Sequence, residues 1–303
     1  MIPAFPTFKP LELSDRAEVE AFNRGFSPYS DFNFFSLICW DTLGEHAISQ
    51  HNGNLVVQFT DYMSGKPFYS FLGRSRISET IENLLSVALQ EGIEPSLKLI
   101  PDIVISEGGV DFQNRFRIEE DHDNHDYILD LPEFLAMQGK IYKKKRYAIT
   151  KYRKQYPAAI IECLNIGDSR THRELLDVCE RWEDTHANAA EQGDNERVAF
   201  RRALELAPEF PMHIVGLRLE GRLVGFNFNE TLHTGHVMSH YGKMEVKEVG
   251  MSDFVEYESA RIMDGLGCTR VNLQQDLGLP SLRQYKKSLR PSCYLRKFII
   301  HPD

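Results

Sequence analysis

The sequence predicts an α+β (mixed α/β) protein made of two lobes, each a mostly antiparallel mixed sheet flanked by helices. The chain has 303 residues, of which 42% are hydrophobic, so it is long enough for two domains that each bury a core. Both halves also show the same order of elements: strand, helices, a β-meander, helix, strand, helix and strand. An acidic stretch separates the halves, and we therefore place the first lobe at residues 1–125 and the second at 126–303.

The first half contains one clear hairpin and two clear helices. Ser14 is a suitable helix cap and Gly25 a suitable terminator, which predicts a helix over 14–23. Asn52-Gly53 favours the positive φ angles of a tight turn and predicts a hairpin over 46–60. Apolar residues at helical spacing predict a further helix over 78–91. Shorter segments follow: strands over 68–72, 97–100 and 116–119, and a helical turn over 102–107.

The second half repeats this order with a longer meander. Glu220-Gly221-Arg222 separates two apolar segments and predicts a hairpin. The expected strands are 127–131, 159–164, 213–219, 223–230, 236–241, 270–273 and 294–300. The expected helices are 140–156, 171–185, 197–207, 253–266 and 280–289. This layout resembles the acetyltransferase-like (GNAT) fold, used twice in tandem.

Composition excludes several classes of protein. No apolar stretch approaches the roughly 18 to 20 residues that a membrane-spanning helix needs, and the first ten residues lack the apolar core of a signal peptide. The five cysteines show no CxxC spacing, which argues against a disulfide framework or a zinc ribbon. We therefore expect a cytoplasmic protein without a transmembrane segment.

Charge is distributed unevenly along the chain. The net charge is −9, which argues against indiscriminate nucleic-acid binding. The segment 140–154, however, carries no acid and a dense set of bases: Lys140, Lys143, Lys144, Lys145, Arg146, Lys151, Arg153 and Lys154. On a helix, such a row interleaved with tyrosines suits a phosphate-rich partner, either RNA or an anionic lipid surface. The alternative is a solvated helix face that balances the acidic remainder.

Two separated motifs of the second half carry a family resemblance. They are Asp126-Tyr127 through Gly139-Lys140-x-Tyr142-x-Lys144-Lys145-Arg146 to Tyr156-Pro157, and Asn272-x-x-x-Asp276-Leu-Gly278-x-x-x-Leu282-Arg283-x-x-Lys286-x-Ser288-x-x-Pro291. The chain resembles the C-terminal catalytic domain of bacterial phosphatidylglycerol lysyltransferases, in particular its soluble two-lobed relatives, and the wider group is similar to Fem-type aminoacyltransferases. The resemblance implies transfer of an amino acid from aminoacyl-tRNA to an amine or hydroxyl acceptor, which is a lipid head group or another small molecule or peptide.

The resemblance also implies a set of site residues. Because an aminoacyl ester is already activated, the protein must align the acceptor and stabilise developing negative charge. Arg283 and Lys286 would supply positive charge, Asp276 would orient an ammonium group and Asn272 would donate a hydrogen bond. The residues implied to bind tRNA or another anion are Lys143, Lys144, Lys145, Arg146, Lys151 and Lys154. Without the resemblance, a charged helix surface and a plain helix cap explain the same residues.

Two other functions remain open. An acyl-CoA-dependent N-acyltransferase of this fold needs a pyrophosphate loop, Q/R-x-x-G-x-G/A, ahead of a helix. The stretch 243–252 keeps only Gly250 and has Ser252 at the second glycine position, so we expect no bound cofactor and treat acyl-CoA as the alternative donor. The other alternative is a catalytically inactive RNA- or lipid-binding module.

The acidic stretch raises the question of a metal site. His122 and His125 lie close to the carboxylates of Glu119, Glu120 and Asp126, and these residue types can ligate a metal. A loop of this composition is more often solvated polar chain. We therefore expect no metal.

Overall fold

The computed structural model describes residues 1–61, 64–109, 112, 114–185, 193–245 and 248–302. The chain forms two compact units. The first comprises Met1–Tyr127, Gln275–Gln284 and Tyr294–Asp303, and the second comprises Ile128–Gln274 and Tyr285–Cys293. The expected division at 125/126 lies close to the first of these breaks. Two C-terminal segments that we expected in the second lobe belong to the first unit.

The first unit is built on a seven-stranded mixed sheet with the order β1-β2-β3-β4-β5-β14-β6. β4 and β5 are parallel and the other neighbours are antiparallel. Its strands are β1 (Lys9–Pro10), β2 (Ala47–His51), β3 (Asn54–Thr60), β4 (Pro67–Leu72), β5 (Leu97–Pro101), β6 (Phe116–Glu120) and β14 (Lys297–Pro302). Parallel strands need a crossover, and helix α3 (Ile77–Gln90) makes it between β4 and β5.

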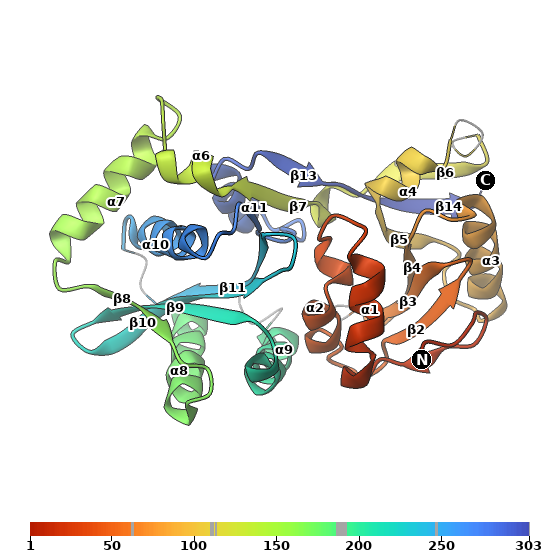
Figure 1. Ribbon diagram of the computed structural model, residues 1–303, viewed down its shortest axis with the longest axis horizontal. Coiled ribbons are helices and arrows are strands. Elements are labelled where there is room, and N and C mark those ends of the chain that lie inside the picture. Colours follow the sequence, from red (N-terminus) through yellow and green to blue (C-terminus); the bar gives the residue numbers. More distant parts are fainter. Residues whose placement is uncertain (62–63, 110–111, 113, 186–192, 246–247, 303) are drawn as a thin grey trace. The chain divides into compact units, whose positions relative to one another are not determined.

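Helices cover both faces of this sheet (Figure 1). α1 (Arg16–Asn23) and α2 (Phe34–Cys39) lie on one face and α3 on the other. The apolar repeat of α3 places Ile81, Leu84 and Ala88 in the core, as the spacing predicts. The remaining elements are short: η1 (Leu13–Asp15), η2 (Ser30–Phe32), α4 (Asp102–Glu107) and η3 (His122–Asn124).

The second unit is built on a sheet with the order β13-β7-β12-β11-β10-β9-β8. β8 to β11 form an antiparallel meander, β11 and β12 are parallel, and β12 pairs antiparallel with β7. Its strands are β7 (Asp126–Asp130), β8 (Ile160–Leu164), β9 (Met212–Leu219), β10 (Arg222–Thr231), β11 (His236–Met244), β12 (Arg270–Asn272) and β13 (Cys293–Leu295).

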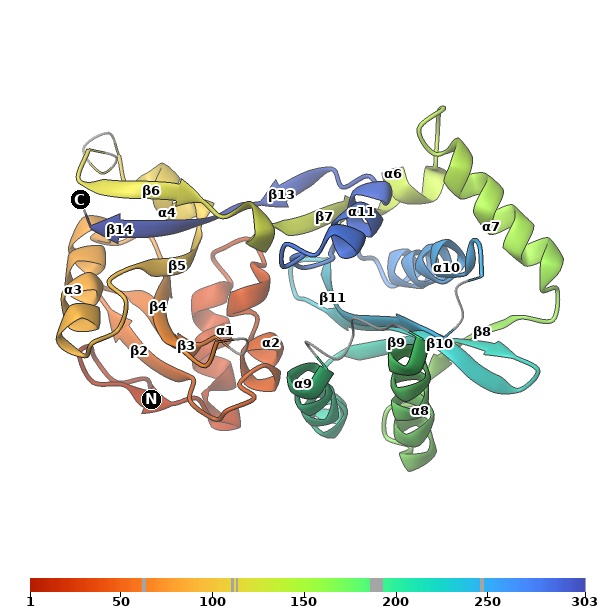
Figure 2. The same ribbon diagram turned by 180° about the vertical axis from the view of Figure 1, so that it is seen from behind.

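Helix α10 (Met251–Gly265) connects the parallel pair and lies on one face of the second sheet, opposite α8 (Ser169–Thr185) and α9 (Gly193–Leu206) (Figure 2). α7 (Lys143–Gln155) packs against the outer side of α10. The remaining helices are α6 (Leu131–Ala136), η5 (Ala207–Glu209) and α11 (Pro280–Ser288).

The predicted fold class is confirmed, because each half is a sheet that contains both parallel and antiparallel neighbours and has helices on both faces. Three details differ from the expected elements. The cationic helix begins at Lys143 rather than Lys140, the first helix is capped by Glu12 and Asp15 rather than Ser14, and the last strand is split into β13 and β14. Among the described residues, no helix is long and apolar enough to span a bilayer.

Candidate active site

The family-motif residues Asp276 and Arg283 form an ion pair in the first unit. Asp276 is fully buried. Its Oδ2 accepts from Arg283 Nε at 2.9 Å and from the Tyr127 hydroxyl, and its Oδ1 accepts from Arg283 Nη2 at 2.7 Å and from the Gly278 N–H at 2.9 Å. Each carboxylate oxygen thus has two donors from the protein itself. The geometry makes Asp276 a residue that fixes Arg283, rather than one that offers an unused oxygen to an ammonium group.

A tight turn places this ion pair. Leu277 and Gly278 both have positive φ, at 54° and 72°, and a Cβ added to Gly278 would lie 2.8 Å from Asp123 Oδ2. Asp123 accepts the Leu277 N–H at 2.9 Å through its carbonyl and pairs with Arg283 through its carboxylate at 2.5 Å. The positive φ therefore favours glycine at position 278, and a side chain there would also displace the Asp123 carboxylate that pairs with Arg283.

Electrostatics settles the charge states of the cluster. Burial would raise the pKa of Asp276, but the hydrogen bonds from Arg283, Tyr127 and Gly278 outweigh it and hold that pKa below its usual value. The hydrogen bonds to Asp276 and Asp123 raise the pKa of Arg283. Burial and the bond to Asp276 raise the pKa of Tyr127. The cluster is a carboxylate held by a neutral phenol and a permanent guanidinium.

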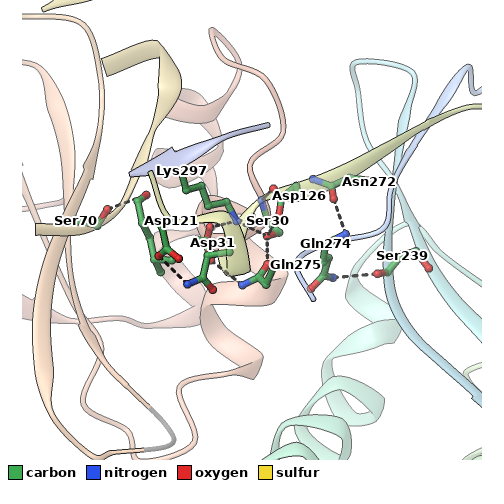
Figure 3. A network of polar contacts seen from close by, with 12 residues as sticks. Ser30, Asp31, Ser70, Asp121, Asp126, Ser239, Asn272, Gln274, Gln275 and Lys297 are labelled. Atoms are coloured by element: carbon green, nitrogen blue, oxygen red, sulfur yellow. Dashed lines mark hydrogen bonds and ion pairs between the residues drawn. The ribbon is translucent and has the colours of Figure 1, made fainter. Parts of the chain in front are cut away.

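A buried lysine in the same unit anchors the segment beside this cluster (Figure 3). Lys297 is fully buried, and its Nζ lies 2.8 Å from Asp126 Oδ1 and also pairs with Asp31. Ser30 donates to Asp126 from its N–H at 2.7 Å and from its hydroxyl at 2.6 Å. Gln275, directly before Asp276, donates to Asp31 at 3.1 Å. The motif loop is thus tied to a satisfied network of buried charges.

Sequence reasoning missed Lys297 and Asp31. Lys297 begins an apolar strand in which a lysine is easily taken for a surface residue, and its two carboxylate partners lie 171 and more residues away. Asp126 and Tyr127 open the first family motif, and their place in it is the signal in the sequence that points to this network.

In the second unit, strand β10 presents a polar row to helix α10. Asn227 Nδ2 donates to Glu256 Oε2 at 3.1 Å, and Asn229 Nδ2 donates to Ser259 Oγ at 3.1 Å. The alternate residues Phe226 and Phe228 face the opposite way and pack against the Phe200 ring of α9. A strand covered on both faces normally reads as continuous apolar residues, so this buried polar row marks a candidate functional layer.

Glu256 is the acid of this layer, and sequence reasoning missed it. Its side chain is buried, and burial raises its pKa despite the hydrogen bond from Asn227. The Tyr285 hydroxyl donates to Glu256 Oε2 at 3.3 Å, and burial raises the pKa of Tyr285 as well. α10 packs against the sheet on one side and against α6 and α7 on the other. Because buried residues therefore occur on more than one face of the helix, the spacing of its apolar residues does not show that Glu256 is buried.

The other two predicted catalytic residues lie in the second unit. Asn272 is fully buried, and its Oδ1 accepts the Gln274 N–H at 2.6 Å. The Gln274 side chain donates to the Ser239 carbonyl at 3.1 Å (Figure 3). Lys286 on α11 is only 8% exposed. The structure therefore joins Asp276 to Arg283 directly, whereas Asn272 and Lys286 belong to the other compact unit.

The predicted cations lie on α7 or, in the case of Lys140, just before it, and the structure buries one of them. Lys145 is buried, and its Nζ lies 2.5 Å from Asp253 Oδ1 of α10, so the structure removes it from the exposed row. Arg146 stays exposed but donates to the Gly139 carbonyl at 2.9 Å, and Arg153 pairs with Glu258. Five exposed lysines have no carboxylate partner among the described residues, and we call them the lysine surface: Lys140, Lys143, Lys144, Lys151 and Lys154.

The amino end of α10 is packed against α7. Gly250 caps this helix with φ at 93°, and a Cβ there would lie 2.4 Å from the Ala148 carbonyl oxygen. An acyl-CoA enzyme of this fold would hold its pyrophosphate at this helix end. Backbone of α7 lies against the one glycine that the loop retains, and Lys247 of the same stretch lies outside the described residues.

The two mixed sheets with helices on both faces give this protein an acetyltransferase-like fold. Residues 24–301 match the family model described as "Phosphatidylglycerol lysyltransferase, C-terminal", and the chain belongs to that family. A comparison with curated proteins gives no match.

Solved structures that share the fold include the following three. A conserved protein of unknown function from Bacteroides thetaiotaomicron is 23% identical, with all of both chains covered and a TM-score of 0.84. L-PGS from Bacillus licheniformis is 17% identical over 95% of this chain and 92% of that one, with a TM-score of 0.61. The C-terminal domain of a putative lysylphosphatidylglycerol synthetase from Agrobacterium fabrum is 12% identical over 86% of each chain, with a TM-score of 0.58.

Proposed function

We propose that this protein transfers an amino acid from aminoacyl-tRNA to an amine or hydroxyl acceptor, either a lipid head group or another small molecule or peptide. The observation that carries the donor assignment is the lysine surface. Five exposed lysines, none of them paired with a carboxylate among the residues that the structure describes, lie together on a chain whose net charge is −9. Phosphate backbones bind such surfaces by releasing counterions, and an anionic membrane surface would be attracted in the same way.

The family motif supplies the groups that transfer requires. The aminoacyl ester is already activated, so the protein's part is alignment and stabilisation of the oxyanion and the leaving ribose oxygen. Arg283 binds its two carboxylates through Nε and Nη2, and we assign its Nη1 to the developing negative charge. Asp276 acts as the positioning residue for Arg283, and Lys286 provides the second positive charge.

Two alternatives remain weaker. Transfer from acyl-CoA would require pyrophosphate binding at the amino end of α10, where α7 packs against Gly250. A binding module without transfer activity would keep the lysine surface but would have no use for the buried Asp276–Arg283 pair.

The decisive experiment follows the label from donor to acceptor. Purified protein is incubated with radiolabelled aminoacyl-tRNAs and an extract of lipids and small molecules, and the labelled product is identified. Lys286→Met should lower turnover by about 100-fold to 1000-fold, as loss of one electrostatic donor does, with little change in tRNA affinity. Lys287→Met, at the exposed neighbour on the same helix, is the matched control. Label that stays on tRNA, or equal turnover in both variants, contradicts the proposal.

A further inference from the structure

Three potential metal ligands meet at the carboxyl end of β6 in the first unit. Glu120 ends the strand, and His122 and His125 lie on and just after the η3 turn. One ligand atom from each residue lies within 4.8 Å of the other two. The sequence predicts a solvated polar loop here, whereas the fold brings one carboxylate and two imidazoles close together.

His125 supplies the observation that points to a ligand. Its side chain is only 8% exposed, and its Nε2 is buried without a hydrogen-bond partner among the described residues. Glu120 Oε1 is the nearby acceptor at 3.5 Å, beyond the usual 2.7–3.2 Å of an N–H···O hydrogen bond. A polar nitrogen that is buried without a hydrogen-bond partner destabilises the folded protein. An occupant between His125 and Glu120 would remove that destabilisation.

The spacing fits a bound metal. Zinc ligands lie about 2.0–2.2 Å from the ion in tetrahedral geometry, which separates neighbouring ligand atoms by roughly 3.3–3.6 Å. Glu120 Oε1 lies 3.5 Å from His125 Nε2 and 3.8 Å from His122 Nδ1. His122 is 72% exposed, and its ring contacts only the edge of the His125 ring among the printed ring contacts of the described residues, so solvent leaves room for a small adjustment. We propose that Glu120, His122 and His125 form a binding site for a divalent transition metal of the zinc class.

The protein supplies three ligands to this site, because the other carboxylates close to it are bound to other residues. The nearby carboxylates have other partners: Asp121 binds Asn124, Asp123 binds Arg283 and Asp126 binds Lys297. Water therefore completes the coordination. The ring of His125 also hydrogen-bonds the backbone of Lys297. A backbone partner on the second nitrogen is the usual way to orient a metal-bound histidine.

The proposed metal ligands flank Asp123, a residue of the candidate active site, in the sequence. Asp123 lies between the two histidines, and it holds Arg283 through its carboxylate and Leu277 through its carbonyl. A metal bound to both histidines would immobilise the turn that carries Asp123. The bound metal thus becomes a positioning device for Arg283, and this last step alone rests on the proposed function.

Metal binding is tested without any transfer assay. Chelator-treated protein is titrated with zinc chloride by calorimetry, and with cobalt chloride while the visible absorption is followed. We expect one equivalent of each metal, and cobalt absorption typical of histidine and carboxylate ligands. His122→Asn and Glu120→Gln should each weaken binding at least tenfold. Glu119→Gln, at the exposed neighbour on β6, should bind as the wild type does.

The variants are chosen to keep the test independent of folding. His122 is exposed and Glu120 is 34% exposed, so their substitution leaves the core intact, whereas the buried His125 serves only as a confirming His125→Gln variant. Unchanged affinity in His122→Asn and Glu120→Gln, or no stoichiometric binding by the wild type, overturns the metal site. Stoichiometric, ligand-dependent binding without aminoacyl transfer would contradict the proposed function and leave the metal site standing.

Discussion

Asp276 owes its ionised state to its neighbours rather than to solvent. A carboxylate this deeply buried is destabilised by loss of water, and two arginine nitrogens, a phenol and a backbone amide replace that water. Lys297 follows the same rule with the signs reversed. Burial would lower its pKa, and the carboxylates of Asp126 and Asp31 raise it above the usual value. At both places removal of one partner would strand the other in a poorly solvated site.

Replacement of Asp276 with Asn should therefore destabilise the protein. We expect a loss of about 1–3 kcal/mol in the free energy of unfolding at neutral pH, because Arg283 is one-third exposed and keeps Asp123 as a partner. The folded-state pKa of Asp276 is depressed, so its contribution is complete above the ordinary value of 3.8 and is lost as pH falls through the lower folded-state value. Denaturant titrations from pH 7 to pH 3 measure the difference.

Asp123→Asn is the control for this experiment, because Asp123 is 57% exposed and an exposed ion pair contributes less than about 1 kcal/mol. Equal unfolding free energies for Asp276→Asn and the wild type at pH 7 would show that the buried pair adds no net stability. A gap between them that widens in acid would contradict the depressed pKa.

At the scale of elements, local patterns predicted most of the structure. Asn52-Gly53 and Glu220-Gly221 form the hairpin turns that their positive φ angles allow, and the apolar repeat of α3 points into the core. Hydrophobic periodicity did not predict which residues are buried in a helix that is covered on two sides. Helix α10 is covered by the sheet and by α7, so Glu256 occupies a site that no single-face periodicity predicts. Lys145 was expected among the exposed cations, and its burial was not predicted because its partner Asp253 lies on another helix.

The lysine surface of α7 leads to a prediction about this one helix. Reversal of Lys143, Lys144 and Lys151 to Glu should weaken tRNA binding at least tenfold, about 1.4 kcal/mol, and should flatten the dependence of affinity on salt. Folding should be preserved, because exposed side chains away from packed contacts change stability by under about 0.5 kcal/mol each. Filter binding over a series of salt concentrations measures both quantities.

A dispersed triple variant controls for net charge. Arg173, Arg201 and Arg270 are exposed cations on three other elements of the second unit, and their reversal to Glu changes the charge by the same amount. It should leave tRNA affinity close to that of the wild type. Equal loss in both triple variants would mean that overall charge, and not the lysine surface, attracts RNA.

At the scale of the whole molecule, the path of the chain was the least predictable feature. The second family motif, Asn272–Pro291, contains the point between Gln274 and Gln275 at which the chain passes from the second unit back to the first. The final apolar segment looked like a single strand, yet β13 joins the second sheet and β14 the first. Pairings such as Tyr127 with Asp276 span 149 residues. Local sequence therefore predicted the motif residues, but their partners came only from the tertiary fold.

The choice between tRNA and acyl-CoA as donor is a property of the whole folded protein, and thermal unfolding tests it. A ligand that binds only the folded state raises stability by about 2.7 kcal/mol at a hundred times its Kd, which corresponds to a Tm increase of several degrees for a protein of this size. Acetyl-CoA should produce no increase, because the loop before α10 retains one glycine and backbone of α7 packs against it. Unfractionated tRNA at low salt, followed by intrinsic protein fluorescence, should raise the Tm of the wild type but not of the α7 triple variant. A Tm that climbs steadily with acetyl-CoA concentration would reverse this ranking and make acyl-CoA the favoured donor.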